Sequence, residues 1–105
     1  MSRILTVGGA QLGPIARNES RRSVVKRMLA LLREAKERGC GLVVYPELAL
    51  TSFFPRWQIE NEEELNGFYE REMPNEETHP LFEEAARLQI GFHLGFAELT
   101  EENGK

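Results

Sequence analysis

Aspartate is absent from this 105-residue sequence, so all 17 acidic side chains are glutamates. This absence excludes a calcium loop built on aspartates and a Ser-His-Asp triad with aspartate as its third member. Cysteine is scarce as well, because Cys40 is the only one. A single cysteine excludes an internal disulfide framework and agrees with a reducing, cytoplasmic location.

Long apolar runs are also missing. The N-terminus, Met1 to Ile4, does not have the apolar stretch of a signal peptide, and no run approaches the roughly 20 apolar residues of a membrane span. Basic residues gather only between Arg17 and Arg27, and the net charge is -4. Nucleic-acid binding needs a broader basic stripe, so we expect neither a membrane nor a nucleic-acid partner.

What remains is the composition of a soluble globular domain, with 41% hydrophobic and 29% charged residues. The run from Ile4 to Ala10 is short, apolar and β-branched at its start, which predicts a buried strand. The segment from Glu19 to Arg38 has apolar residues at helical spacing. We predict a helix there, with Asn18 as its N-cap and Gly39 as the left-handed residue that ends it.

The all-apolar run from Leu42 to Tyr45 follows this helix and predicts a strand covered on both faces. Strand, helix and strand in this order form a βαβ unit, whose right-handed crossover makes the two strands parallel. Further along, we expect a short surface helix from about Glu62 to Glu72, capped by Asn61, and a helix that starts at Pro80. Alternation from Ile90 to Ala97 predicts a third strand.

The last residues carry a turn signal. Asn103-Gly104 is a strong indicator of a hairpin turn, yet only Lys105 follows it. We therefore expect residues 1–105 to be the N-terminal part of a longer domain.

A candidate catalytic residue lies just after the second predicted strand. Glu47 follows Pro46, which stiffens the strand exit, at the sheet edge where ligands bind in open α/β folds. Its apolar neighbours, among them Tyr45 and Phe54, would disfavour the charged carboxylate, which suits a general base or acid near neutral pH. A helix-capping or salt-bridging role is the alternative that these residues alone leave open.

The run YPELALTSFFPRW, from Tyr45 to Trp57, resembles the segment around the first catalytic residue of nitrilase-superfamily carbon–nitrogen hydrolases. Its continuation past Pro46-Glu47 is most similar to N-carbamoyl-D-amino acid hydrolases. Four further stretches carry the same resemblance: GPIAR at 13–17, FYEREMP at 68–74, HPLFEEAA at 79–86 and GFHLGFAEL at 91–99. The resemblance therefore spans nearly the whole chain.

This resemblance implies an α/β fold that is part of a four-layer α-β-β-α sandwich of the nitrilase type, truncated after about three strands. It also implies a Glu, Lys and Cys active site in which Glu47 takes the proton of a nucleophilic cysteine and later activates water. The substrate would be a small molecule, no metal or other cofactor would be needed, and the full-length form would be a homo-oligomer. The lysine and the nucleophilic cysteine would lie outside residues 1–105.

The other chemistry-bearing residues have two interpretations each. Phe53, Phe54 and Trp57 would wall the substrate pocket or simply fill the core, and Arg56 would meet a substrate carboxylate or form a surface ion pair. Cys40 precedes Glu47 at a position the family does not use, so we interpret it as a small buried thiol. His93 is expected to be half-buried, and His79 to begin a helix. They do not form a metal site.

Three functions stay open at this stage. The first is an N-carbamoyl-D-amino acid hydrolase of which the 105 residues are an inactive N-terminal part. The second is a non-catalytic remnant or a subunit that depends on a partner chain, since an uncovered sheet edge favours pairing. The third is an amidase of the same superfamily with a different substrate.

Overall fold

Helix α1 (Arg21–Glu37) is the longest element of the chain, and its ends follow from local chemistry. The Ser20 side chain accepts a hydrogen bond from the Ser23 amide at 3.1 Å, so the N-cap is Ser20 and the prediction of Asn18 was wrong. A hydroxyl two residues later satisfies the same orphan amide groups. Gly39 has a φ of +85°, which confirms it as the left-handed residue after the helix.

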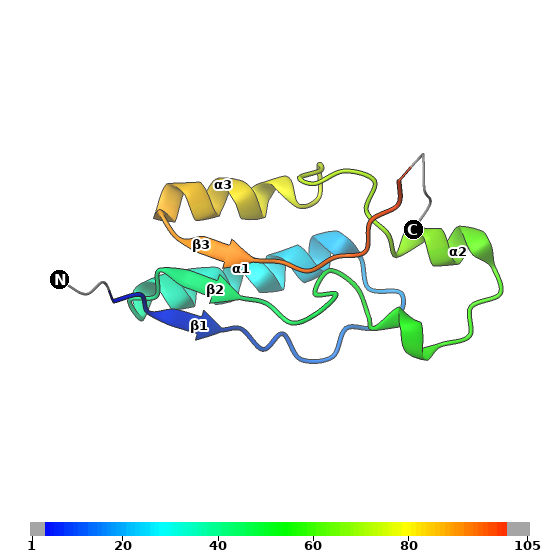
Figure 1. Ribbon diagram of the computed structural model, residues 1–105, viewed down its shortest axis with the longest axis horizontal. Coiled ribbons are helices and arrows are strands. Elements are labelled where there is room, and N and C mark those ends of the chain that lie inside the picture. The colour runs from blue at the N-terminus through cyan, green and yellow to red at the C-terminus, as the bar shows by residue number, and fades with distance from the viewer. Residues whose placement is uncertain (1–3, 101–105) are drawn as a thin grey trace.

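The computed structural model describes residues 4–100 and contains three parallel strands. These are β1 (Val7–Gly9), β2 (Leu42–Val44) and β3 (Gly91–His93), in the spatial order β1-β2-β3. The parallel pairing predicted for the βαβ unit is confirmed. All three strand arrows point toward the same end of the molecule (Figure 1). Each strand is shorter than predicted, because the flanking apolar residues run on as irregular chain.

The two faces of this sheet differ. Gly8, Val43 and Phe92 occupy one row of the register and face the helices: Gly8 lies close to Ala35 of α1, and Phe92 stacks on Phe82 at 5.1 Å between ring centroids. On the other face Val7 is 51% exposed and Val44 is 38% exposed. The prediction that the second strand is covered on both faces was therefore wrong for this chain, because both long helices lie on one side.

The core lies between the sheet and the helices α1 and α3 (His79–Leu88). Helix α3 lies beside α1 (Figure 1), and valine, methionine and leucine side chains of α1 share one buried cluster with Leu81 and Ala85 of α3. Pro80 is in the first turn of α3, as predicted. The large apolar side chains that are fully buried are Val24, Met28, Leu32, Val43 and Leu81.

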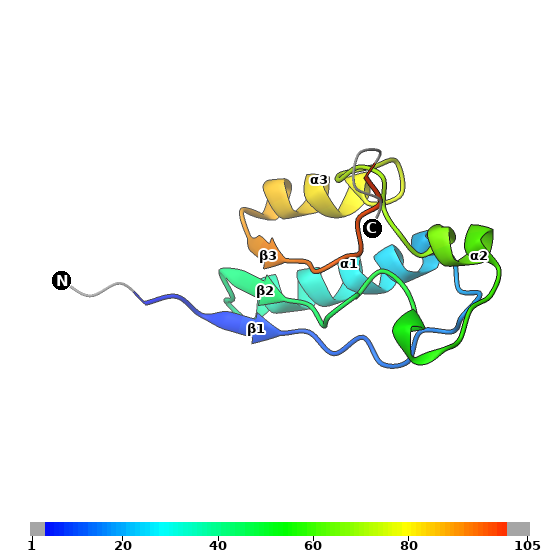
Figure 2. The ribbon, with the colours of Figure 1, turned by 45° about the vertical axis from the view of Figure 1, so that its right-hand side comes forward.

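A second group of segments lies beyond the carboxyl ends of the strands (Figure 2). It contains a short 3-10 helix, η1 (Phe54–Arg56), and α2 (Glu62–Gly67). Asn61 caps α2 as predicted, accepting from the Glu64 amide at 3.2 Å, but α2 ends five residues before the predicted Glu72. The nearly buried Glu70 joins this group to α1 through Arg21, with 2.6 Å between Oε2 and Nε.

The sequence also led to expectations about a hairpin turn near the C-terminus and about membrane-spanning segments. The predicted hairpin turn at Asn103-Gly104 lies outside the described residues. Among residues 4–100, none of the helices has the length and apolar character that a membrane crossing requires.

Candidate functional site

Glu47 lies just past the carboxyl end of β2, where both neighbouring strands hold the chain. The Ala10 amide donates to the Val44 carbonyl at 2.9 Å, and the Tyr45 amide donates to the His93 carbonyl at 3.1 Å. Glu47 then begins a turn whose later residues, Ala49 and Leu50, are 1% and 2% exposed. The carboxylate is thus presented from a turn that is anchored in the core on both sides.

The residue after Glu47 has a strained backbone. Leu48 has a φ of +50°, a left-handed conformation that costs a non-glycine residue about 1–3 kcal/mol. Such conformations persist only where the surrounding structure imposes them, and they cluster at functional sites. Here the next two residues, Ala49 and Leu50, are buried, and the turn lies directly beside Glu47.

Glu47 lines a hollow of about 230 Å³. One wall is the segment from Pro46 to Phe53, without Leu50, and the opposite wall is the segment from Leu12 to Ile15. These walls follow β2 and β1 respectively, so the hollow lies outside the carboxyl ends of two adjacent parallel strands. Ligands of open α/β sheets bind in this position.

The Glu47 carboxylate is more open than the sequence predicted. Glu47 is an exposed residue, and within residues 4–100 its carboxylate makes no hydrogen bond or ion pair. The expected apolar enclosure was wrong because two of the expected neighbours point elsewhere. Tyr45 turns toward α1, where its hydroxyl reaches the Met28 carbonyl, and Phe54 turns toward α2.

The three aromatic candidates separate in space. Phe53 is 46% exposed and lines the Glu47 hollow. Phe54 is 5% exposed and stacks on Phe68, with 5.1 Å between ring centroids and an interplanar angle of 8°. The guanidinium of Arg17 lies over the Trp57 ring, with 5.0 Å between Cζ of Arg17 and the ring centroid. The structure therefore brings Phe53 to Glu47 but not the other two, and the side chain of Arg56 lies outside the described part.

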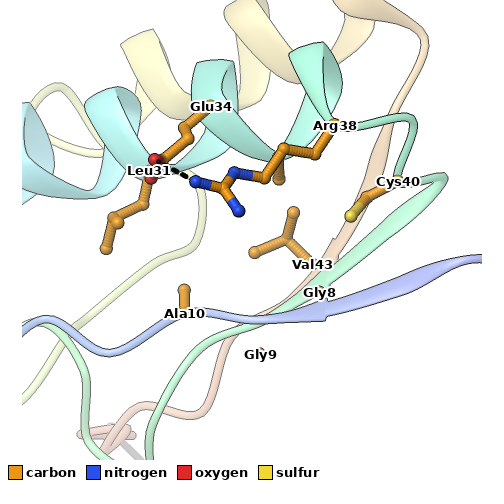
Figure 3. A pocket seen from close by; sticks show the side chains of 9 residues that line it. Gly8, Gly9, Ala10, Leu31, Glu34, Arg38, Cys40 and Val43 are labelled. Carbon is orange, nitrogen blue, oxygen red and sulfur yellow. Dashed lines mark hydrogen bonds and ion pairs between the residues drawn. The ribbon is translucent and has the colours of Figure 1, made fainter.

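Cys40 lies at the opposite end of the sheet from Glu47. It lines a separate hollow of about 300 Å³ between β1 and α1, together with the ion-paired Glu34 and Arg38 (Figure 3). At about 3.3 Å per extended residue, β2 and its flanks hold Cys40 and Glu47 on the order of 15–20 Å apart. Cys40 is only half-buried, and this separation rules it out as the proton donor to Glu47.

The two histidines stand apart. His93 is exposed on the open face of the sheet rather than half-buried as predicted, because no second layer covers that face in this chain. His79 begins α3 as predicted and lies 3.4 Å from the Glu83 carboxylate. Within residues 4–100, no three metal-binding side chains come together.

Two features of the hollow have no counterpart in the sequence analysis. Ser52 is 2% exposed, and its hydroxyl has no hydrogen-bond partner within the described residues, although Ser52 lines the hollow. The wall from Leu12 to Ile15 was not assigned to the site at all. Gly13-Pro14 is a turn signal, but a turn signal does not indicate which strand exit the turn will face.

Comparison with known proteins decides the family. The model of the carbon-nitrogen hydrolase family matches residues 6–105. The chain belongs to the carbon-nitrogen hydrolase family. This confirms, at the level of the nitrilase superfamily, the resemblance carried by Tyr45 to Trp57. The three parallel strands and helices of this family member are consistent with part of a nitrilase-type fold.

Proposed function

We propose that this carbon-nitrogen hydrolase sequence is the N-terminal part of an N-carbamoyl-D-amino acid hydrolase in which Glu47 is the general base. The observation that carries the proposal is the place of Glu47, on a strained turn in a hollow at the strand ends of a family member. The continuation of the Pro46-Glu47 motif to Trp57 supports this substrate class over other amides.

The proposed chemistry needs two groups that this sequence does not place near Glu47: a nucleophilic cysteine and a lysine. Glu47 takes the proton of the thiol, because a thiol with a pKa near 8.5 is only partly ionised at pH 7. The thiolate attacks the carbamoyl carbon, and the lysine stabilises the oxyanion that develops. Collapse of this intermediate breaks a carbon–nitrogen bond, and the proton held by Glu47 passes to the departing nitrogen. Glu47 then activates one water molecule, and the overall products are the D-amino acid, ammonia and carbon dioxide.

The open face of the sheet supports the four-layer architecture of this proposal. Val7 is exposed in the first register row and Val44 in the third, beside Gly9 and His93. Both rows are on the open face, which is an apolar surface of the kind that a second sheet covers in a sandwich. We propose that residues beyond Lys105 supply that sheet together with the lysine and the cysteine. Assembly of the full-length form into a homo-oligomer and its cytoplasmic location belong to the same proposal.

An activity assay tests the proposal directly. The purified 105-residue chain should release no ammonia from an N-carbamoyl-D-amino acid, whereas the form that includes the lysine and cysteine should release it. In that longer form, Glu47→Gln should lower kcat by about 10²–10⁴-fold, the usual contribution of a general base, while Glu76→Gln serves as a remote control. Turnover by the 105-residue chain, or full activity of Glu47→Gln, would contradict the proposal.

A non-catalytic, partner-dependent chain is the second candidate. Its supporting observation is the same uncovered apolar face, together with the distance of Cys40 from Glu47. The coding sequence past Lys105 discriminates the two: a stop codon favours the remnant, and a reading frame with the lysine and cysteine favours the enzyme. A third candidate, a superfamily amidase with another substrate, would turn over a nitrile, β-ureido acid or simple amide in preference to the carbamoyl compound.

A further inference from the structure

The wall opposite Glu47 is held by one side chain of α1. Arg27 donates through Nη2 to the Leu12 carbonyl and, at 3.2 Å, to the Pro14 carbonyl. Within residues 4–100, these are the only hydrogen bonds to backbone groups of the segment Leu12–Ile15. Gly13, between the two carbonyls, has a φ of +76°, and a Cβ there would lie 3.7 Å from the Arg27 guanidinium.

Glu19 completes this arrangement at the other end of the wall. Its two carboxylate oxygens accept from Arg27 Nη1 at 3.1 and 3.0 Å. The same carboxylate accepts from the Ala16 amide at 3.3 Å and from the Ser23 hydroxyl at 3.0 Å. Arg27 and Glu19 therefore hold both ends of the wall segment against α1, and we call this pair the wall clamp.

We infer that the wall clamp of Arg27 and Glu19 positions the substrate-facing wall opposite Glu47, which makes Arg27 a positioning residue of the hydrolase. The inference rests on the proposed function of the Glu47 hollow. The clamp sets the width of the hollow because the other wall is anchored separately, through Ala49 and Leu50. Arg27 itself does not line the hollow, so its effect on a ligand must pass through the wall.

Charge and burial both support a fixed clamp. The Arg27 side chain is 33% exposed and that of Glu19 is 17% exposed. Water therefore competes for the hydrogen bonds of this ion pair less than it does for those of fully exposed ion pairs. The pKa of Glu19 is lowered, chiefly by the hydrogen bonds from Arg27. The Glu19 carboxylate thus stays ionised throughout the neutral range in which a hydrolase of this family would work.

Arg27→Lys tests the inference with little change in size or charge. A lysine ammonium is a point donor and cannot bridge two wall carbonyls and a carboxylate as the planar guanidinium does. The first readout is the dissociation constant of N-carbamoyl-D-alanine for the longer form that includes the lysine and the cysteine, made inactive by Glu47→Gln. The second is the set of NMR amide shifts of Gly13, Ile15 and Ala16 in the 105-residue chain. The control is Arg38→Lys, which changes an ion-paired arginine at the C-cap of the same helix, 3.2 Å from Glu34.

We expect Arg27→Lys to weaken probe binding by roughly fivefold to tenfold and to shift the wall amides, with the urea midpoint of unfolding equal to that of Arg38→Lys. Glu19→Gln should shift the same amides in the same direction but less, because the glutamine oxygen still accepts one bond. Combined in one chain, the two changes should not add, since Glu19 acts on the wall partly through Arg27.

Three outcomes would overturn the inference. Probe binding by Arg27→Lys equal to that of the unmodified chain would show that the clamp does not position the wall. A loss of binding that follows a lower urea midpoint would assign Arg27 to general stability alone. Failure of the unmodified longer form to bind the probe would contradict the proposed function of the hollow, whereas wall amides that do not move in Arg27→Lys of the 105-residue chain would contradict the positioning role alone.

Discussion

The hydroxyl of Tyr45 donates a hydrogen bond to the backbone carbonyl of Met28 at 2.8 Å, deep in the core. Tyr45 is 3% exposed, and it is the last residue before the Pro46-Glu47 pair. The bond therefore ties the exit of β2 to the middle of α1. It holds the chain two residues before the candidate general base.

Burial of Tyr45 predicts a specific loss of stability in alkali. Desolvation raises the pKa of Tyr45 well above its ordinary value near 10. Above pH 10 the unfolded chain releases this proton while the folded chain keeps it, so the free energy of unfolding should fall by about 1.4 kcal/mol per pH unit. Tyr45→Phe should remove this slope and cost about 0.5–1.5 kcal/mol at pH 7, as measured by urea unfolding from pH 8 to 11.

Glu84 should give the opposite dependence in acid. Hydrogen bonds from Arg87 and Arg33 lower the pKa of Glu84 to about 2, and the Arg33 bond joins α1 to α3. Because the folded pKa lies below the unfolded one, this stabilisation is complete above about pH 5 and is lost as the pH falls toward 2. Glu84→Gln should lower the urea midpoint at pH 7 but not at pH 2.

The control for that prediction is Glu76→Gln. Glu76 is exposed, and its side chain forms no ion pair within residues 4–100. An equal loss for both variants at pH 7 would contradict the assignment to the bonds across the two helices.

Adjacent phenylalanines should behave differently. Phe54 is 5% exposed and stacked on Phe68, so Phe54→Ala should cost about 3 kcal/mol or more of unfolding free energy. Phe54→Leu, which keeps most of the volume, should cost about 1 kcal/mol. Phe53→Ala should cost less than about 1 kcal/mol, because Phe53 is half exposed. Thermal unfolding of the three variants would reverse our assignment if Phe53→Ala proved the most damaging.

The left-handed Leu48 predicts a separation of stability from activity. Leu48→Val should destabilise the chain by about 1–3 kcal/mol, because a β-branched residue tolerates a positive φ poorly. Leu48→Gly should stay within about 1 kcal/mol of the unmodified chain, since glycine adopts this conformation freely. In a catalytically complete form, Leu48→Gly should nevertheless lower kcat with little change in KM, because Glu47 loses its fixed direction. An unchanged kcat would argue against the turn as a positioning element.

Val44 provides a test of whether a second sheet covers the open face in a longer form of the protein. It is 38% exposed on the open face, so Val44→Lys in the 105-residue chain should reduce self-association and barely change the urea midpoint. In a longer form whose second sheet covers this face, the same change should cost several kcal/mol, because it buries an unpaired charge. Light scattering and urea unfolding measure the two effects. Similar, small costs in both forms would contradict the sandwich architecture.

The sequence was sufficient for the parts of this structure that depend on local pattern. The stripe of Val25, Met28 and Leu32 predicted α1, and Gly39 predicted its end, because helical spacing and left-handed backbone are properties of single segments. The place of Glu47 at a strand exit followed from strand order alone. The failures were tertiary. Whether Tyr45 and Phe54 would enclose Glu47 depended on which way each side chain turned, and neighbouring residues alone do not fix that.

The missed parts of the site have a common physical cause. In the sequence, Arg27 is only the last of the basic residues gathered from Arg17 onward, because its partners Leu12 and Glu19 are brought to it by the fold. Ser52 and Leu48 are unremarkable in sequence, since neither a partnerless hydroxyl nor a positive φ is encoded by residue type. Contacts that join distant segments become visible only when the chain is assembled.

The spatial order β1-β2-β3 has a consequence for biosynthesis. Each strand pairs only with its neighbour along the chain, so no early strand waits for a later one to be inserted beside it. Chains emerge from the ribosome at about 5–20 residues per second, which leaves each strand–helix–strand unit time to close before the next one emerges. Nascent-chain arrest experiments would then find the β1-α1-β2 unit protected from protease before α3 has been translated.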